Sequence, residues 1–423
     1  MIKKNNKPEI RFKGFTDEWE QRELGEISSL ITKGTTPLDK SNIGTVNFIK
    51  IESIDNSSGK ITITQKISSE EHEGDLRRSQ LKENDILFSI AGTLGRVTLV
   101  TSSILPANTN QALAIIRLKS GCLKYVKEYL KGKAVADFIK KNPTIGAQPN
   151  LSLEQVSNLK IALPSEIEQE QIGIFFETLD NLITLHQHKY DKYKNIKNAL
   201  LEKMFPKKGK KIPGIRFKGF TDDWEQRKLG EFGKSTGGTS LESEFSESGK
   251  YKVISIGSYS ENSTYNDQGI RAVKSDKTSN RILNKNDLTM ILNDKTTSGN
   301  IIGRVLLIEE SGVYVYNQRT ERIEINLDKY NPVFLYEMLN AQNIRKKIIK
   351  QAQGNTQIYV NWSTIESLDY MVPSKEEQAK IGAYFKNLDN LITLHQRKYN
   401  LYKKYNKILF KKIFYKEKKW KIT

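Results

Sequence analysis

An internal repeat constrains the fold of this chain more than any other feature. Residues 10–24 read IRFKGFTDEWEQREL and return at 215–229 as IRFKGFTDDWEQRKL. The segment LDNLITLHQ stands at 179–187 and again, unchanged, at 388–396. Shorter echoes follow in the same order, namely GRV at 95–97 and 303–305, NQ at 110–111 and 317–318, and PS at 164–165 and 373–374. Two copies of one unit fill nearly the whole chain, so we expect two versions of one structure.

The two copies agree at their edges and differ in their interiors. The interiors, at about 35–80 and 240–280, share little, although the segments on either side nearly match. The matching parts indicate a common scaffold, and the mismatched parts indicate two surfaces that face different targets. Drift of loops after an old duplication is the alternative, but drift alone would not preserve long identical segments at both edges.

Each copy has the pattern of a mixed α+β domain. Runs of β-branched and aromatic residues alternate with Gly-, Ser- and Asn-rich segments, which predicts short strands joined by loops. The expected strands are 46–51, 59–64, 85–90 and 113–118 in the first copy, and 251–256, 287–292, 303–308 and 322–326 in the second. Short helices are expected within 124–140 and 332–350. We therefore predict two similar α+β domains with mixed β-sheets, related by an internal pseudo-twofold repeat.

Each copy ends in a segment with the features of a long helix. Ser165 with Glu168, and Ser374 with Glu377, match the S-x-x-E capping box that starts helices. Large residues then recur every three to four positions along a helix of about 40 residues, or about 60 Å. A helix that long needs a partner stripe, so we expect the two helices to pair as an antiparallel coiled coil between the domains. Packing of each helix on its own domain is the alternative. The residues expected at this helix and partner interface are Leu179, Ile183, His186, Tyr190, Tyr193, Leu200, Leu388, Ile392, His395, Tyr399, Tyr402 and Leu409.

These features predict the boundaries of the domains. Pro206 and the Pro213-Gly214 pair break the first helix, and lysines crowd the segment between them. The expected segments are a first domain at 1–164, a first long helix at 165–206, a basic linker at 207–214, a second domain at 215–373, a second long helix at 374–416 and a basic tail at 417–423.

The charge balance indicates a polyanionic partner. The 68 Lys and Arg residues outnumber the 49 Asp and Glu residues, which gives a formal net charge of +19. Such an excess favours nucleic acid first and an anionic membrane surface second, although a basic protein without such a partner would show it too. No run approaches the roughly 18–20 apolar residues that cross a bilayer. No apolar core follows the basic start, so we expect a cytoplasmic protein.

Signatures of enzymes are missing from the sequence. It contains no G-x-x-x-x-G-K-[ST], no G-x-G-x-x-G after a strand and no H-E-x-x-H. The single cysteine, Cys122, excludes a disulfide scaffold and a cysteine-based zinc site. Residues 331–334 (NPVF) are similar to the N-P-P-[YF] of amino-methyltransferases but lack its second proline, so we interpret them as an Asn cap with Pro opening a helix. We expect no catalytic residue and no metal site in this chain.

The ordered set of motifs resembles the specificity subunit of type I restriction–modification systems. The openings at 15–25 and 220–230 resemble the start of target-recognition domains, as does KGTTP at 33–37, echoed by GGTS at 237–240. The helix starts, built on Pro-Ser, Glu-Gln and Ile-Gly, match as well. The resemblance covers essentially the whole chain, twice, although the second loop lacks the proline of the first.

The resemblance implies two target-recognition domains that each read one half of a split, asymmetric DNA site. It implies that the long helices act as a ruler and as a docking platform for two methyltransferase subunits, through which the restriction and translocase subunits join. S-adenosylmethionine for adenine-N6 methylation, together with ATP and Mg, would be held by partner subunits. This chain would bind no cofactor and no membrane, and its partners would be double-stranded DNA and those subunits.

Base readers are expected among the loop side chains of the divergent interiors, because such side chains recognise base edges. The candidates in the first copy are Thr35, Thr36, Arg77, Arg78, Ser79, Gln80, Asn108 and Gln148. The candidates in the second copy are Thr239, Ser240, Tyr259, Arg281, Lys295, Thr296, Thr297, Arg319 and Tyr359. A solvated loop side chain is the alternative for each of them. Gly34 and the two Asn-Gln pairs occur in both copies, so a scaffold role is open for them.

Two other functions remain open from the sequence alone. A non-catalytic coiled-coil adaptor with incidental basic charge would bind protein partners and would show no DNA sequence preference. A self-sufficient methyltransferase or nuclease would bind S-adenosylmethionine by itself, but the missing cofactor loop and the missing carboxylate–lysine constellation argue against it. The sequence favours a DNA sequence-specificity subunit.

Overall fold

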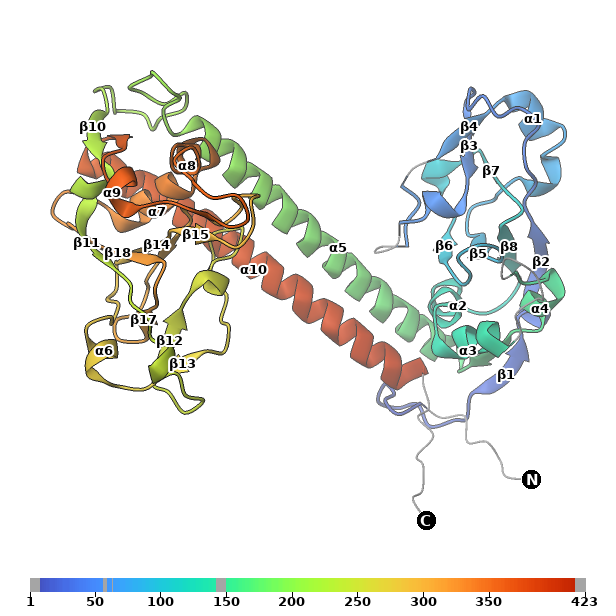
Figure 1. Cartoon of the computed structure of the whole chain (residues 1–423). Helices are drawn as coiled ribbons and strands as arrows, with labels where there is room; N and C mark the ends of the chain where they lie inside the picture. Colours follow the sequence, from blue (N-terminus) through green and yellow to red (C-terminus); the bar gives the residue numbers. More distant parts are fainter. Residues whose placement is uncertain (1–7, 56–58, 63, 142–149, 415–423) are drawn as a thin grey trace, which may run out of the picture. The chain divides into compact units, whose positions relative to one another are not determined.

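The computed structural model describes residues 8–55, 59–62, 64–141 and 150–414, which form two compact units (Figure 1). The first unit comprises Met1–His188 with Gln396–Thr423, and the second comprises Lys189–His395. Each unit takes part of two long helices, α5 (Glu166–Lys203) and α10 (Lys375–Phe414). The predicted base reader Gln148 and the predicted basic tail at 417–423 lie outside the described residues.

The first unit is built on two small sheets and a two-stranded ribbon. Its main sheet is antiparallel, whereas its second sheet contains one parallel pair, β3 with β7. The main sheet has the order β2 (Ser28–Lys33), β8 (Leu113–Leu118), β5 (Ile86–Ser89), β6 (Val97–Leu99); the second has the order β4 (Gln65–Ile67), β3 (Val46–Ile49), β7 (Ala107–Thr109); the ribbon pairs β1 (Glu20–Glu23) with β9 (Lys160–Leu163).

The second unit repeats this arrangement strand for strand. Its main sheet has the order β11 (Gly233–Gly237), β18 (Thr320–Ile325), β14 (Leu288–Ile291), β16 (Val305–Leu307); its second sheet has the order β13 (Arg271–Ala272), β12 (Tyr251–Ile254), β17 (Tyr314–Tyr316); its ribbon pairs β10 (Glu225–Lys228) with β20 (Asp369–Val372). Again the second sheet holds the one parallel pair, β12 with β17. The predicted α+β class and the internal repeat are confirmed. One further ribbon, β15 (Asn293–Asp294) with β19 (Ile358–Tyr359), is matched in the first unit only by an isolated bridge between Ala91 and Asn150.

Short helices flank the sheets. The first unit has α1 (Ser69–Glu73), α2 (Leu123–Leu130), α3 (Lys133–Lys141) and α4 (Leu153–Ser157), and the second has α6 (Asp276–Ser279), α7 (Pro332–Asn340), α8 (Gln342–Ile349) and α9 (Trp362–Ile365). Each expected helical stretch is therefore two helices, because Ala341 takes an extended conformation (ψ 130°) and Gly132 separates α2 from α3. The Asn331 side chain accepts a hydrogen bond from the Phe334 N–H at 2.9 Å, which confirms the predicted Asn cap.

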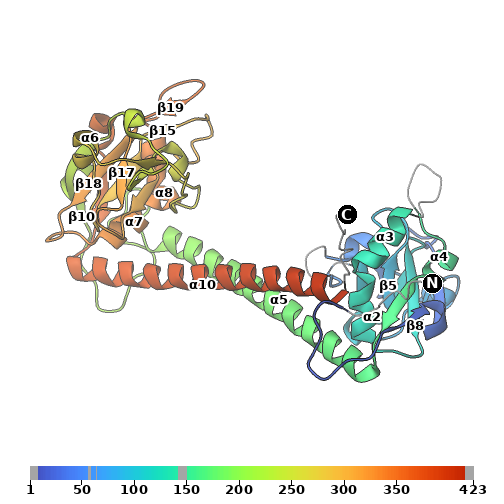
Figure 2. The same cartoon turned by 90° about the horizontal axis from the view of Figure 1, so that it is seen from below.

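Aromatic side chains fill the core of each unit where the main sheet meets helices. In the first unit α2 and α3 lie along β5 and β8 (Figure 2), and Tyr125 and Phe176 are fully buried there. In the second unit Trp224, Phe334 and Phe385 occupy the corresponding core. Burial of each such ring contributes about 1.5–3 kcal/mol, so these rings fix the long helices onto the sheets.

Buried ion pairs join the repeated opening segments to the long helices. Arg11 Nε and Nη2 donate to the two carboxylate oxygens of Glu168, each at 2.7 Å. Arg216 makes the same two contacts with Glu377, each at 2.8 Å. Both glutamates are fully buried. The expected capping boxes therefore form only in part: the serine hydroxyl accepts the Glu N–H at 3.4 Å, but the Glu side chain bonds an arginine.

The two long helices contact each other within each unit. In the first unit Phe176 packs against Phe410 and Phe414, while His186 stacks on Tyr402 with ring centroids 5.5 Å apart. Because the α10 partner falls in number as the α5 residue rises, the helices run antiparallel there. In the second unit the equivalent stack joins Tyr193 to His395, also at 5.5 Å. All of the predicted interface residues are buried or half-buried, namely Leu179, Ile183, His186, Tyr190, Tyr193, Leu200, Leu388, Ile392, His395, Tyr399, Tyr402 and Leu409. Leu179 and Leu388 also belong to the cores, so the helices pack on their own domains as well.

A buried charge cluster braces the helix pair of the second unit. Lys197 Nζ donates to Glu337 at 2.9 Å and to both carboxylate oxygens of Asp389 at 2.7 Å. Glu337 is 1% exposed, and burial raises the pKa of its carboxyl, with the Asp389 charge adding to the rise. Lys197 is therefore the cation that keeps these two acids together.

The first unit pairs its corresponding two acids with a lysine from a different position. Glu128 and Asp180 stand where the second unit has Glu337 and Asp389, and Lys131 reaches both, at 2.9 and 3.6 Å. Asn406, at the same distance beyond the LDNLITLHQ segment as Lys197, donates to Asp180 at 2.8 Å. In the first unit the cations are Lys131, just after α2, and Lys127, on α2, which also contacts Glu128 at 2.9 Å, whereas in the second unit the cation comes from α5.

Candidate nucleic-acid interface

The first candidate surface is the loop at 34–41, which leaves β2 from a tightly fixed point. The Thr35 N–H donates to Thr109 O at 3.0 Å, and the Gly34 N–H donates to Leu113 O at 3.3 Å. A Cβ on Gly34 would lie 2.0 Å from Thr109 O, so only glycine allows this approach. The backbone of β7 and β8 therefore sets where the loop starts.

Side chains from three segments then hold this loop. Glu71 of α1 accepts the N–H groups of Leu38 and Asp39 at 2.9 and 3.0 Å. Arg78, on the 3₁₀ turn η3 (Arg77–Ser79), donates to the Thr35 hydroxyl at 3.1 Å. Thr36 bonds Gln111. The predicted readers Thr35, Thr36, Arg77 and Arg78 are thereby brought together, with both arginines exposed.

Three other predicted readers of the first unit support this loop from within. Ser79 and Asn108 are fully buried, and Asn108 Nδ2 donates to Leu76 O at 2.8 Å and to Ser79 Oγ at 3.1 Å. Gln80 is half-buried and donates to His72 O at 2.9 Å. The structure places these polar groups in the frame beneath the loop, where their hydrogen-bonding capacity is already used.

The second unit has an equivalent loop at 238–244, after β11, which is held by different hydrogen bonds. Gly238 donates to Thr320 O at 2.8 Å, and a Cβ on Gly238 would lie 2.0 Å from Asn317 O. Asn317 accepts the Leu241 N–H at 3.0 Å and donates to Glu242 at 3.0 Å, and Glu242 also accepts from Ser240. These hydrogen bonds lower the pKa of the Glu242 carboxyl. Asn317, which both copies share as the first residue of the Asn-Gln pair, thus supports the second loop from within.

Replacing Gly238 by Ala should displace the second loop, because a backbone carbonyl cannot move away from the new methyl group. We expect Gly238→Ala to lower the free energy of unfolding by about 1–3 kcal/mol and to alter hydrogen exchange in residues 238–244. Gly237→Ala is the matched control, since its Cβ would meet only the Glu321 carboxylate at an ordinary 3.5 Å. Equal losses from the two adjacent variants would contradict this account.

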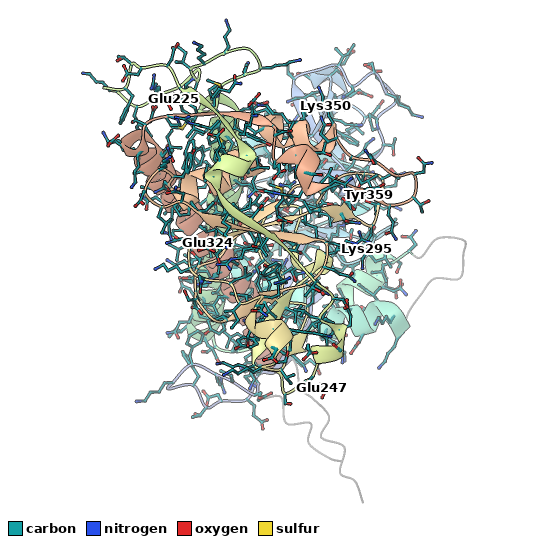
Figure 3. All side chains as sticks on the ribbon, turned by 60° about the vertical axis from the view of Figure 1, so that its left-hand side comes forward. Glu225, Glu247, Lys295, Glu324, Lys350 and Tyr359 are labelled. Carbon is teal, nitrogen blue, oxygen red and sulfur yellow. The ribbon has the colours of Figure 1, made fainter. Side chains whose placement is uncertain are left out.

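A second group of predicted readers lies along one edge of the second unit. Lys295, Thr296 and Thr297 are exposed on the connection that follows β15, and Tyr359 on β19 is 39% exposed and pairs with Asn293. Figure 3 shows Lys295 and Tyr359 at this edge, with Glu324 elsewhere on the unit. Exposed Arg319 is adjacent, since its carbonyl accepts the Leu292 N–H at 2.9 Å. A lysine, an arginine, hydroxyls and an aromatic ring thus meet on one edge.

The remaining predicted readers of the second unit differ in exposure. Tyr259 is 4% exposed, and burial raises the pKa of its hydroxyl well above the usual range, so it belongs to the core. Thr239 is half-buried beside Asn317. Arg281 is half-buried, with its guanidinium 5.8 Å from the Tyr316 ring centroid. Of these side chains, only Arg281 carries a charge that can reach a phosphate.

Sequence reasoning missed the residues that fasten the loops. Glu71 and Glu242 look like ordinary surface acids in the sequence, and nothing in their spacing distinguishes them. Sequence reasoning also missed Arg345 of α8, which is 6% exposed and bonds the backbone carbonyls of Gly299 and Ile302. Its position beside buried Ile344 and Ile348 on a helical period is the one signal that could have marked it as inward-facing.

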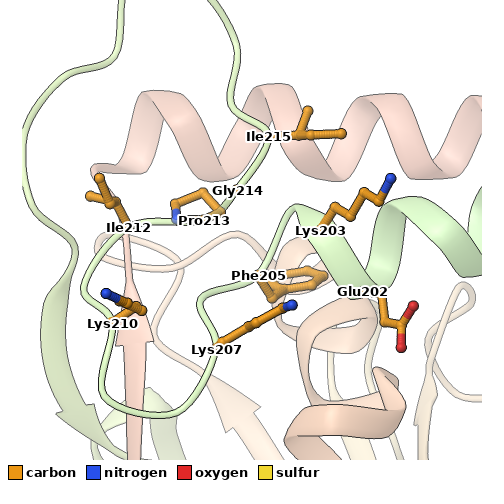
Figure 4. Close-up of a pocket in the computed structure, with 9 residues that line it drawn as sticks. All are labelled: Glu202, Lys203, Phe205, Lys207, Lys210, Ile212, Pro213, Gly214 and Ile215. Atoms are coloured by element: carbon orange, nitrogen blue, oxygen red, sulfur yellow. The ribbon is translucent and has the colours of Figure 1, made fainter.

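A hollow of about 540 Å³ lies beside the linker of the second unit (Figure 4). Its lining combines apolar residues with three lysines and one glutamate. The lining residues are Glu202, Lys203, Phe205, Lys207, Lys210, Ile212, Pro213, Gly214 and Ile215. Within residues 8–55, 59–62, 64–141 and 150–414, no group of three or more His, Cys, Asp or Glu side chains could hold a metal ion. Within the same residues, no helix is long and apolar enough to cross a membrane.

Comparison with known proteins identifies one family. The family described as "Type I restriction modification DNA specificity domain" matches residues 16–195 and 221–403, one match for each copy of the repeat. The chain is 24% identical over 410 residues to the type I restriction enzyme MjaVIII specificity subunit of Methanocaldococcus jannaschii, covering 94% of this chain and 92% of that protein. It is also 24% identical over 404 residues to the putative type I restriction enzyme MjaX specificity subunit of the same organism, covering 90% and 89%.

A solved structure shares the fold. The type I restriction–modification system S subunit from M. genitalium superposes with a TM-score of 0.67 at 15% identity, covering 97% of this chain and all of that one. At this identity the likeness concerns the fold alone. It extends over both units, so the duplicated α+β architecture occurs in a protein of similar length.

Proposed function

This chain belongs to the type I restriction modification DNA specificity family, and we propose that it selects the DNA sequence on which a type I restriction–modification complex acts. Each unit reads one half of a bipartite, asymmetric site. The observation that carries this proposal is that one scaffold presents two different sets of loops. Glu71 fastens the first loop and Glu242 fastens the second, on strands that otherwise match one for one.

The chemistry of the loops suits DNA. Exposed Arg77 and Arg78 in the first unit, and Lys295 and Arg319 in the second, can neutralise phosphates, which fixes orientation without reading sequence. The hydroxyls of Thr35 and Thr297 are short donors and acceptors for base edges. Because phosphate contacts release counterions, binding should weaken by about 10³-fold or more between roughly 50 and 200 mM salt.

The chemical steps fall to partner subunits in this proposal. The chain contributes recognition and a docking surface on α5 and α10, and two methyltransferase subunits bring S-adenosylmethionine to adenine N6. Restriction and translocase subunits, with ATP and Mg, join through the methyltransferase. This chain then carries no catalytic residue, in line with the missing enzyme signatures of its sequence.

The test is a genome-wide map of N6-methyladenine in the host, with this gene intact, deleted, or carrying an exchanged first interior (residues 35–80). We expect a bipartite motif that disappears on deletion and changes in only one half on exchange. An unchanged map, with the methyltransferase still expressed, would instead favour a protein-binding adaptor. A change in both halves would overturn the assignment of one half-site to each unit.

A further inference from the structure

One connection between strands is longer in the second unit than in the first. Residues 292–304 connect β14 to β16, whereas residues 90–96 make the corresponding connection in the first unit. The connection in the second unit is therefore six residues longer, with 13 residues against 7. It contains β15 and the β15–β16 loop (residues 295–304), in which Lys295–Ser298 are all exposed. Although exposed, this loop is tied to the unit at several points.

A buried arginine holds the base of the loop. Arg345 Nη1 donates to Gly299 O at 2.9 Å and to Ile302 O at 2.8 Å. Burial lowers the pKa of Arg345 to about 10, so it stays charged at neutral pH. Asp294 secures the other side, since it accepts the Thr296 and Ile301 N–H groups, each at 3.0 Å. One cation and one anion thereby satisfy backbone groups at both ends of the loop tip.

A second set of contacts holds the C-terminal end of the loop, just before β16. Arg304 Nε donates to Asn300 O at 3.0 Å, and its Nη1 donates to Ser263 Oγ at 3.0 Å. Ser263 in turn donates to Asn340, which also accepts the Val305 N–H at 3.0 Å. The loop is therefore held by α7, α8 and residues near 263, while Lys295 and Thr297 stay exposed at its tip.

The first unit lacks both the longer connection and the arginine. Gly95 and Gly303 occupy the same place in the shared GRV segment, and they pack against Ile139 and Ile348 respectively. Counting back equally from these isoleucines, the first unit has Ala136 where the second has Arg345. The arginine and the longer connection thus occur together in one unit and are absent together from the other.

We propose that Arg345 is a positioning residue for DNA recognition, which fixes the β15–β16 loop so that its tip reads bases of the half-site assigned to the second unit. This inference rests on the proposed function. A loop that is ordered before binding loses less conformational freedom on the DNA and presents its donors in one geometry. Arg345 touches no DNA itself and acts through the backbone carbonyls of Gly299 and Ile302.

The test replaces Arg345 by Met, which keeps the apolar stem and removes both donors, in the full chain expressed with its methyltransferase. Methylated motifs are then mapped across the genome. We expect discrimination at one or more base positions of one half-site to fall about fivefold or more, with the other half-site unchanged. Arg345→Lys, which keeps the positive charge and N–H donors but loses the planar guanidinium, should retain an intermediate preference. Lys346→Met, at an exposed neighbour on α8, is the matched control and should leave the motif unchanged.

The outcomes separate this inference from the proposed function. A merely structural role would lower methylation at all sites without changing which bases are preferred, and that result would overturn the inference. If Arg345→Met does not accumulate as soluble protein, Lys295→Ala and Thr297→Ala at the exposed tip decide the question. They should change the same half-site, and an unchanged motif in both would reject the loop as a reader. A wild-type chain that directs no bipartite motif would refute the proposed function itself.

Discussion

Replacing Lys197 by Met should lower the free energy of unfolding of the second unit by about 3–5 kcal/mol above about pH 9, where Glu337 is ionised when Lys197 is present. The substitution leaves Glu337, which is 1% exposed, and Asp389 close together without the cation that lies 2.7–2.9 Å from both. An uncompensated buried charge costs far more than a lost surface pair. Thermal or denaturant unfolding of the full chain, with hydrogen exchange to locate the loss in α7 and α10, is the measurement.

The loss from Lys197→Met should also depend on pH. The folded-state pKa of Glu337 is raised, so this carboxyl's contribution to stability is fully present below its unfolded pKa and is lost as pH rises through the folded value. Without Lys197 the folded pKa rises further, because the lysine was lowering it. Because the folded pKa of Glu337 is raised to about 8 even with Lys197 present, the deficit of the variant should be smallest below about pH 7. It should grow as the pH rises through 8 towards about 10. A second substitution, Glu337→Gln, should recover part of the loss.

Two results would contradict this account of Lys197. The first is a deficit that does not change with pH. The second is an equal deficit in Lys192→Met, the matched control at an exposed position of the same helix, where we expect a change within about 0.5 kcal/mol.

Replacing Arg216 by Met should destabilise the second unit by a similar amount, about 3–5 kcal/mol. The buried carboxylate of Glu377 would lose both of its 2.8 Å donors, and the opening segment would lose its attachment to the start of α10. We expect hydrogen exchange to increase at β10 and at the first turns of α10, and no change at β1 and at the first turns of α5. The repeat predicts the mirror result for Arg11→Met, with the loss confined to the first unit.

The control for the Arg216 experiment is a superficially similar ion pair. Arg227 contacts Glu225 and lies in the same unit, but both side chains are exposed. Arg227→Met should cost no more than about 1 kcal/mol. If Arg227→Met and Arg216→Met were equally destabilising, burial would not explain the contribution of the Arg216–Glu377 pair to the free energy of unfolding.

The sequence revealed the architecture because repetition marks shared structure. Two matching edges predicted two α+β units, and the Asn331 cap followed from a local rule that needs no tertiary context. The break at Ala341 did not follow, since alanine favours helix, and its extended conformation and full burial appear only in the folded chain. The helix starts were identified correctly, yet their glutamates bond arginines more than 150 residues away in sequence, which no local pattern encodes.

The candidate readers show where sequence reasoning fails. Ser79, Asn108 and Lys295 are all polar and lie between predicted strands, so the sequence alone does not distinguish them. In the structure Asn108 donates a hydrogen bond to Ser79 beneath the loop at 34–41. Lys295, in contrast, is exposed at the tip of the β15–β16 loop of the second unit. Which of two polar residues is buried depends on partners that are distant in the chain. Arg345 was missed for the same reason, because its partners are backbone carbonyls.

The division of the chain into units has a consequence for the order of folding during synthesis. The second unit, Lys189–His395, is one continuous segment of the chain. All of it is therefore synthesised before residues 396–414. The first unit needs those later residues, because Phe410, Ile413 and Phe414 cover its aromatic core around Phe176. The unit that is translated first is therefore the last to be completed, which reverses the usual N-terminal-first order. Until then, its apolar core remains open to chaperones and to neighbouring nascent chains.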